Sequence, residues 1–351
     1  MEATKSADAK ESISAALLPP PGSKDLSRIV CHRGLHDPDL LDPSRPVENS
    51  LGAYEKAWKH FDLCECDITA SSDGTLFLCH DETYMRVLDP HHPMTHRFGG
   101  VPVSDLEASD IQSLRLLDGT RPTTLVEVLD KAKSFLGKES GVKKMVIELK
   151  KDAAADTVVK ELGMLLTDRR PDFVQHVGVI MSFDVGMMKH MAEWRSSAVK
   201  AHPEVKSIQL MLLTEAPDHW AEANHTVRMD VTDLNFKSEC LRVVKECGVD
   251  GVYLEYQVEM TEMALSLKET KWQEELRALS SKIPVGVWNY WSSQPDGLKT
   301  LDAFTSLGFA YINSDLPEDE FVFMGLADKP ERDSCWGPFL SAFFCLNDDR
   351  R

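Results

Sequence analysis

The stretch VGVIMSFDVGMMKHMAEW, residues 177–194, shows the unit from which the rest of the fold is built. Its first part, VGVIMS, is apolar without polar alternation, which is typical of a strand covered on both faces. Its second part, Phe183–Trp194, carries apolar side chains at a spacing of about 3.6 residues, which predicts a helix. The stretch is therefore predicted to form one strand followed by one helix.

The same unit repeats along the chain. The other apolar runs are RIVCH (28–32), FDLCECD (61–67), KMVIEL (144–149), SIQLML (207–212), DGVYLE (250–255), IPVGVW (283–288) and AYINS (310–314). Helical patterns lie between them, such as Leu241–Cys247 before Gly248, and glycine is common just past a helix end. Eight strands alternating with helices predict an α/β fold, and we favour a (β/α)8 TIM barrel. Because periodicity does not report closure, an open doubly wound sheet is the alternative.

One insertion interrupts the alternation after the second strand. LFLCH (76–80) closely follows Ser71-Ser72-Asp73-Gly74, which predicts the return limb of a hairpin. The residues from 81 to 143 then hold a short helical pattern, Thr124–Phe135, and much loop. We divide the chain into a flexible N-terminal tail (1–27), a single barrel domain (28–320), and a C-terminal extension (321–351) whose aromatic residues pack on the barrel.

The amino-acid composition indicates the cellular compartment and disfavours some classes of partner. The 351 residues include 39 basic and 57 acidic ones, a net charge of −18, which disfavours nucleic acid as a partner. The eight cysteines form no CxxC pair, so we expect free thiols in a reducing compartment. The N-terminus lacks the apolar core of a signal peptide, and the most apolar stretch, Cys335–Leu346, is too short to span a bilayer. These features predict a cytoplasmic protein without stable membrane insertion.

Ionisable residues stand at the carboxyl ends of the predicted strands, where TIM barrels place their chemistry. Glu65 and Asp67 lie two residues apart on one strand, so both face the same side while Cys64 and Cys66 face the other. Two carboxylates at one strand end repel each other unless a cation lies between them. Glu148, at the end of a neighbouring strand, would complete an oxygen site for Mg²⁺ or Ca²⁺. The alternative is that these acids are solvated or pair with lysines.

Two histidines and two cations accompany the acids. His32 and His80 each follow a cysteine, and one histidine could accept a proton while the other donates one. Arg33 and Lys150 would make the site locally electropositive, as an anionic substrate requires. The alternatives are core histidines bonded to backbone carbonyls and ordinary surface ion pairs. Trp288 could hold a quaternary ammonium group by cation–π contact, or simply pack at the top of the barrel.

These residues fall in motifs that occur in a fixed order. The motifs are His32-Arg33-Gly34, Glu48-Asn49-Ser50, Glu65-Cys66-Asp67, Asp73-Gly74, His80-Asp81 with Arg86 beyond, and Glu148-Leu149-Lys150. The series resembles the glycerophosphodiester phosphodiesterase family of TIM-barrel enzymes. The similarity continues through Ser182-Phe183-Asp184, Val287-Trp288 and Asn313-Ser314-Asp315, and covers about residues 28 to 318. One departure is the long segment Leu35–Val47 between the first two motifs, which could reshape the entrance to the site.

The resemblance implies hydrolysis of a small-molecule glycerophosphodiester, such as glycerophosphocholine or glycerophosphoethanolamine, to glycerol 3-phosphate and an alcohol. The implied site consists of His32 and His80 as acid and base, Glu65, Asp67 and Glu148 as ligands of Mg²⁺ or Ca²⁺, and Arg33, Lys150, Glu48 and Asn49 around the phosphate. One alternative is a phospholipase D-like enzyme of the sphingomyelinase D type that cleaves lysophospholipids. The other is a non-catalytic barrel that binds a phosphorylated ligand.

Overall fold

The computed structural model describes residues 26–36, 46–135, 141–217, 226–290 and 297–315. The predicted C-terminal extension, most of the predicted N-terminal tail and the centre of the Leu35–Val47 segment lie outside these ranges. The division of the chain into these three segments therefore stays a prediction.

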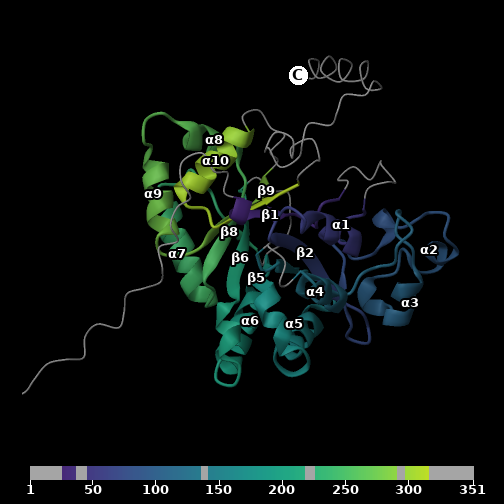
Figure 1. Ribbon diagram of the computed structural model, residues 1–351. Helices are drawn as coiled ribbons and strands as arrows, with labels where there is room; N and C mark the ends of the chain where they lie inside the picture. Colours follow the sequence, from purple (N-terminus) through teal and green to yellow (C-terminus); the bar gives the residue numbers. More distant parts are fainter. Residues whose placement is uncertain (1–25, 37–45, 136–140, 218–225, 291–296, 316–351) are drawn as a thin grey trace, which may run out of the picture.

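Strands and helices alternate as the sequence predicts (Figure 1). The strands are β1 (Ile29–Cys31), β2 (Leu63–Ala70), β3 (Leu76–Leu78), β4 (Lys144–Leu149), β5 (Val177–Ser182), β6 (Gln209–Glu215), β7 (Val227–Arg228), β8 (Gly251–Glu255), β9 (Val285–Tyr290) and β10 (Tyr311–Ser314). The helices are α1 (Leu51–Ala57), α2 (Pro93–Phe98), α3 (Ala108–Ser113), α4 (Leu125–Lys133), α5 (Ala155–Met164), α6 (Val185–Ala198), α7 (Phe236–Cys247), α8 (Val258–Leu265), α9 (Lys271–Ser280) and α10 (Gly297–Leu307). Single turns of 3-10 or π-helix join several of them.

Closure of the sheet settles the architecture. Among the described strands, eight run parallel in the order β1-β2-β4-β5-β6-β8-β9-β10, and β10 pairs back onto β1. In register, Val30 of β1 faces Leu63 of β2 on one side and Asn313 of β10 on the other. The fold is therefore a closed (β/α)8 barrel, and the open doubly wound sheet is excluded.

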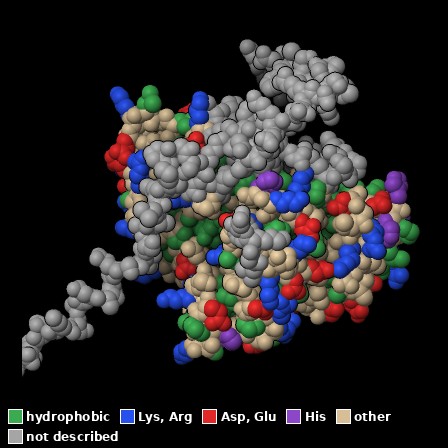
Figure 2. Space-filling view, in the orientation of Figure 1, with side chains coloured by type: hydrophobic (Ala, Val, Ile, Leu, Met, Phe, Trp, Pro, Cys, Tyr) green, Lys and Arg blue, Asp and Glu red, His purple; other side chains and the backbone are tan. Residues whose placement is uncertain are grey.

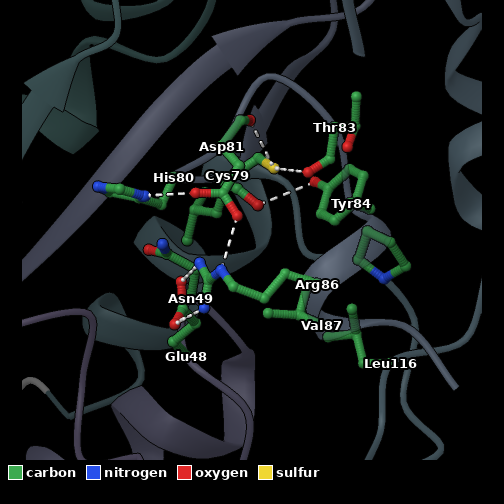
Figure 3. Close-up of a pocket in the computed structure, with 12 residues that line it drawn as sticks. Glu48, Asn49, Cys79, His80, Asp81, Thr83, Tyr84, Arg86, Val87 and Leu116 are labelled. Carbon is green, nitrogen blue, oxygen red and sulfur yellow. Dashed lines mark hydrogen bonds and ion pairs between the residues drawn. The ribbon is translucent and has the colours of Figure 1, made fainter. Parts of the chain in front are cut away.

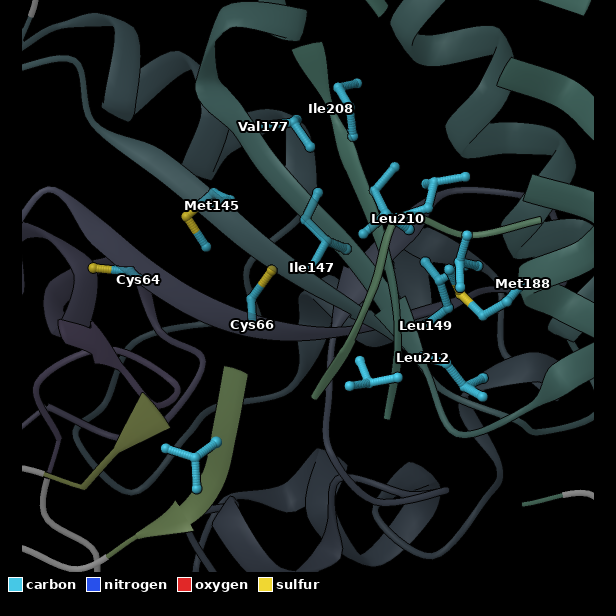
Figure 4. Packing of buried hydrophobic residues seen from close by; sticks show 14 of the residues in the cluster. Cys64, Cys66, Met145, Ile147, Leu149, Val177, Met188, Ile208, Leu210 and Leu212 are labelled. Carbon is cyan, nitrogen blue, oxygen red and sulfur yellow. The ribbon is translucent and has the colours of Figure 1, made fainter. Parts of the chain in front are cut away.

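Alternation along each strand separates two apolar layers. Inward side chains such as Val146, Met181 and Met211 fill the barrel interior. Outward side chains, including Cys64 and Cys66, pack against the surrounding helices (Figure 4). Full burial of one such aliphatic side chain contributes about 1.5–3 kcal/mol to the free energy of unfolding. This alternation also fixes which residues beyond the apolar part of each strand point into the top of the barrel.

The insertion after β2 begins with the predicted hairpin, because β3 runs antiparallel to β2. Beyond it the chain forms α2 and α3, which the sequence did not predict, and both lie to one side of the barrel in Figure 1. A separate apolar cluster that includes Phe77, Tyr84 and Ile111 holds this segment together. Alternation along LFLCH predicts that Cys79, next to His80, faces the helix layer, but Cys79 belongs to this cluster, so that prediction is wrong.

Several helix ends follow capping chemistry visible in the sequence. The Ser50 hydroxyl accepts a hydrogen bond from Ala53 N at the start of α1. Thr124 and Glu127 form a reciprocal capping box on α4. Gly248 adopts the left-handed conformation just after α7, as predicted from its position. These caps fix where the chain leaves each helix and returns to the barrel.

One glycine in the barrel wall is required by close packing. A Cβ on Gly286 would lie 2.7 Å from ring carbons of the buried Tyr253. We expect Gly286→Ala to lower the free energy of unfolding by about 1–3 kcal/mol, because overpacking a rigid core forces its neighbours apart. Urea denaturation measures this effect, with Gly100→Ala as the control, since its nearest contact would be the flexible end of Met85. Equal midpoints for the two variants would contradict the expectation.

The described surface carries mixed charge. Acidic and basic side chains are interspersed over the face shown in Figure 2. Within the described residues, every helix is too short or too polar to cross a bilayer.

Candidate active site

A cavity of about 420 Å³ opens at the carboxyl ends of the barrel strands. This size lies within the range of about 300–1,000 Å³ that is usual for small-molecule sites. Seven of the predicted site residues line it: His32, Arg33, Glu48, His80, Glu148, Lys150 and Trp288. The other three, Asn49, Glu65 and Asp67, are buried. The structure thus brings residues from both halves of the barrel to one place.

Three carboxylates lie together on neighbouring strands. Asp67 of β2 pairs in register with Glu148 of β4, and Glu65 lies two residues earlier on the same face of β2. One oxygen from each of the three lies within 4.8 Å of the others. Glu65 Oε1 and Asp67 Oδ1 are buried without a hydrogen-bond partner among the described residues. Lys150 Nζ forms an ion pair with Asp67 Oδ1 at 3.4 Å. Buried carboxylate oxygens without a hydrogen bond fit a hard divalent cation, so these residues suit the metal predicted from the sequence.

The pKa values of the two β2 carboxyl groups are shifted in opposite directions. Burial, together with the charges of Asp67 and Glu148, raises the pKa of Glu65 to about 8. Burial also acts to raise the pKa of Asp67, but the charges of Lys150 and Arg33 outweigh it and hold that pKa below its usual range. A divalent cation would supply the nearby positive charge that Glu65 needs to stay ionised.

Two cationic side chains stand over the carboxylates. Arg33 Nε lies 3.2 Å from Asp67 Oδ2, and its backbone N–H donates to Glu65 Oε2 at 2.9 Å. Lys150 Nζ donates to Glu148 Oε1 at 2.7 Å. Burial would lower the pKa of Lys150, but Glu148 and Asp67 raise it, so the ammonium stays charged. Both cations also border the cavity, where they can attract an anion.

Asn49 lies behind the carboxylates and holds one of them. Its Nδ2 donates to Asp67 Oδ2 at 2.9 Å, and its Oδ1 accepts from Tyr54 Oη at 2.8 Å. Asn49 has a φ of 55°, a left-handed conformation that asparagine tolerates better than most residues. The amide is thus occupied by protein groups, and a contact of Asn49 with substrate stays a prediction.

His32 extends from the end of β1 and pairs with an aspartate from the last strand. Its Nδ1 lies 2.7 Å from Asp315 Oδ1, and its Nε2 lies 4.0 Å from Glu65 Oε2. A carboxylate oxygen accepts hydrogen bonds, so Nδ1 carries the proton and Nε2 faces the site. Burial disfavours the charged ring, but the charge and hydrogen bond of Asp315 together with the charge of Glu65 outweigh it, and the pKa of His32 is raised.

His80 follows β3 and is held in the same way (Figure 3). Its Nδ1 lies 2.7 Å from Asp81 Oδ1, and Arg86 Nε donates to Asp81 Oδ2 at 2.7 Å. Arg86 also donates to both oxygens of Glu48 at 2.7 Å. This chain of contacts ties the insertion to the barrel and fixes the orientation of the His80 ring.

The opposite wall of the cavity is mainly apolar. Met181, Phe183, Leu213 and Trp288 line it. The Phe183 and Trp288 rings meet edge to face with centroids 5.1 Å apart. Trp288 Nε1 donates to the Thr214 carbonyl at 3.0 Å, which fixes the indole in place. Trp288 therefore lies at the cavity, and its contact with a substrate stays a prediction.

Sequence reasoning assigned no role to several residues in the cavity wall. Asp315 and Arg86 belong to the sequence motifs described above, but no pattern in the sequence linked them to the two histidines. His36 also borders the cavity, and its Nε2 lies 4.0 Å from Asp315 Oδ1. Burial lowers the pKa of His36, so this ring favours the neutral form. Glu215 of β6 was missed because its strand was predicted to end at Leu212.

Barrels with ionisable groups at this end are commonly enzymes, and a carboxylate cluster that could hold a metal, beside cationic side chains, suits a substrate that carries phosphate. The barrel and its site thus define a phosphoric diester hydrolase. The sequence pattern of the glycerophosphoryl diester phosphodiesterase family matches residues 32–273, so the chain belongs to that family. Glycerophosphodiester hydrolysis is the general activity of that family, as the resemblance in the motifs indicated. No curated protein matches the chain significantly.

Solved structures share the barrel at low sequence identity. A glycerophosphodiester phosphodiesterase from Parabacteroides distasonis is 16% identical, covers 87% of this chain and 99% of its own, and has a TM-score of 0.55. One from Agrobacterium tumefaciens is 18% identical, covers 85% and 99%, and has a TM-score of 0.54. A phosphodiesterase from Oleispira antarctica, solved in complex with the product sn-glycerol-3-phosphate, is 14% identical, covers 86% and 98%, and has a TM-score of 0.53. At these identities the likeness shows the fold.

Proposed function

We propose that this protein hydrolyses glycerophosphodiesters such as glycerophosphocholine or glycerophosphoethanolamine to glycerol 3-phosphate and the free alcohol. The observation that carries the proposal is the cavity itself, where two aspartate-bound histidines and two cations surround a buried carboxylate cluster. The glycerol phosphate bound to the related Oleispira antarctica enzyme supports the same product here.

We propose that Glu65, Asp67 and Glu148 hold a divalent cation, either Mg²⁺ or Ca²⁺. Such an ion would withdraw charge from the phosphate and stabilise the charge that develops during attack. Arg33 and Lys150 would bind the non-bridging phosphate oxygens from the same side. Glu48 positions Arg33 through a contact of 3.2 Å between Oε1 and Nη1, while Arg86 holds Glu48 from behind.

The two histidines would divide the proton transfers. In hydrolysis a water oxygen bonds to phosphorus, and the bond from phosphorus to the alcohol oxygen breaks. One histidine takes the proton from the water, and the other gives its proton to the departing alkoxide. His32 and His80 suit these roles because each is anchored through Nδ1, which leaves Nε2 to exchange the proton. The assignment of acid and base between them stays open.

Release of glycerol 3-phosphate from glycerophosphocholine tests this proposal directly. The full chain should release product with Mg²⁺ or Ca²⁺ and lose activity with excess chelator. Absence of release with either ion would contradict the proposal. Lysophospholipids would then test the sphingomyelinase D-like alternative, and ligand-dependent thermal stabilisation without turnover would indicate a binding barrel.

Metal binding should also stabilise the protein in the absence of substrate. An ion at a hundred times its Kd adds about 2.7 kcal/mol to the free energy of unfolding, because it binds the folded carboxylate cluster alone. We therefore expect Mg²⁺ or Ca²⁺ to raise the melting temperature, measured by calorimetry. Glu148→Gln should abolish the increase, whereas Glu262→Gln, at an exposed position, should keep it. An increase of equal size in both variants would place the ion elsewhere.

A cytoplasmic location also stays a proposal. The six cysteines within the described ranges are buried free thiols, which supports a reducing compartment.

A further inference from the structure

A buried carboxylate stands on the cavity wall that lies across the barrel from Arg33. Met211 and Leu213 of β6 point into the barrel interior, so Glu215, two residues further on, points into the cavity above them. Its residue surface is 5% exposed. In the closed strand order, β6 lies across the barrel from β1, which carries His32. β5 lies between β6 and β4, which carries Glu148, and among the described carboxylates Glu215 does not belong to the group whose oxygens lie within 4.8 Å of one another.

Among the residues that the structure describes, no cationic side chain balances the charge of Glu215. Its Oε2 accepts from the Thr226 hydroxyl at 2.9 Å, and within the described residues no basic side chain lies within 4 Å of either oxygen. Arg228 pairs with Glu215 in strand register, but its side chain is exposed and its Nη1 donates to the Pro217 carbonyl at 3.4 Å. A buried carboxylate without a cation is costly, so such a group is usually matched by a ligand.

Glu255, on the neighbouring strand β8, is a buried carboxylate with a structural role and serves as a comparison for Glu215. Its Oε2 accepts from Ala216 N at 2.8 Å, and its Oε1 accepts from Asn289 Nδ2 at 3.3 Å. Both oxygens of Glu255 thus hold protein groups, and its side chain does not border the cavity. Glu215 differs because, within the described part of the chain, only its Oε2 has such a partner, and because its side chain does border the cavity.

Two aromatic rings line the same cavity as this carboxylate. The Trp288 indole bonds to the carbonyl of Thr214, the residue immediately before Glu215, and the Phe183 ring packs against that indole. Aromatic faces attract ammonium groups, and a carboxylate adds direct charge attraction. A carboxylate that shares a cavity with two rings is thus suited to an organic cation rather than to a hydrated metal ion.

We propose that Glu215, Trp288 and Phe183 form a subsite for the ammonium group of the leaving alcohol, which rests on the proposed function. The cavity then has two oppositely charged ends. Arg33 and Lys150 hold the phosphate at one end, and Glu215 holds a quaternary or primary ammonium group at the other. The enzyme therefore selects zwitterionic diesters over diesters with an uncharged alcohol.

Kinetics on two diesters test this assignment. The wild type should cleave glycerophosphocholine more efficiently than glycerophosphoglycerol, whose alcohol is neutral. Glu215→Gln keeps the size and the hydrogen bond to Thr226 but removes the charge. We expect it to lower kcat/KM for the choline diester about tenfold, mostly through KM, and to change kcat/KM for the neutral diester less than twofold. Glu259→Gln, at an exposed position on α8, should change neither substrate.

Two outcomes would overturn the assignment: equal losses on both diesters, or no loss on either. If neither diester is cleaved, the proposed function is contradicted but the cation subsite is not. A binding measurement then tests the subsite by itself. Calorimetric titration should show that choline binds the wild type about tenfold more tightly than 3,3-dimethylbutanol, its uncharged isostere. That preference should disappear in Glu215→Gln. Equal binding of the two probes to the wild type would refute the cation subsite.

Discussion

Replacing His80 with alanine is expected to lower the turnover number about a hundredfold or more. The ring would otherwise exchange a proton with the substrate or the attacking water through Nε2, and alanine cannot do so. The melting temperature should change little, because the His80 side chain is 34% exposed and its contact is with Asp81. Asp81 keeps its ion pair with Arg86 in the variant, so the insertion stays attached to the barrel.

Steady-state release of glycerol 3-phosphate and a thermal melt of the same preparations measure both effects. His96→Ala is the matched control, because this histidine is exposed on α2, and it should retain wild-type turnover. Retention of activity by His80→Ala would remove this histidine from the mechanism. A large fall in melting temperature would instead indicate a structural role for the ring.

The alternation of strands and helices, and the shared face of Glu65 and Asp67, could be predicted because both depend on local pattern. Alternation on a strand is strictly two-residue, so Glu65 and Asp67 had to share a face once their strand was recognised. Parallel strands then bring their carboxyl ends to one edge, which places Glu148 beside Asp67. The three-residue convergence follows from strand order and register alone, and the oxygens do lie within reach of one ion.

Other parts of the site depend on contacts that no local pattern encodes. The pair of His32 with Asp315 joins the two ends of the barrel, so it exists only because β10 closes onto β1. The link from Arg86 to Glu48 depends on how the insertion packs, and that segment was read as loop although its own apolar cluster makes it compact. Glu215 was not predicted because the strand was expected to end at Leu212, whereas β6 continues to Glu215.

Replacing Asp315 with asparagine should lower the turnover number by about a hundredfold or more, although this side chain need not touch the substrate. Asparagine has nearly the same shape, but its amide can donate to Nδ1 and favour the tautomer that carries the proton on Nε2. The charge that stabilises the imidazolium is lost as well. Asp315 therefore acts as a positioning residue for His32.

The pH profile separates this role from a merely structural one. Burial lowers the pKa of His32 and the carboxylate of Asp315 raises it, so removing the carboxylate leaves burial to dominate. The pKa of His32 must then fall, and the limb of the kcat profile that reports this ring should move to lower pH. Asp302→Asn, at an exposed position on α10, should leave the profile unchanged. An Asp315→Asn variant with reduced kcat but unmoved limbs would contradict the role of Asp315 in setting the protonation of His32.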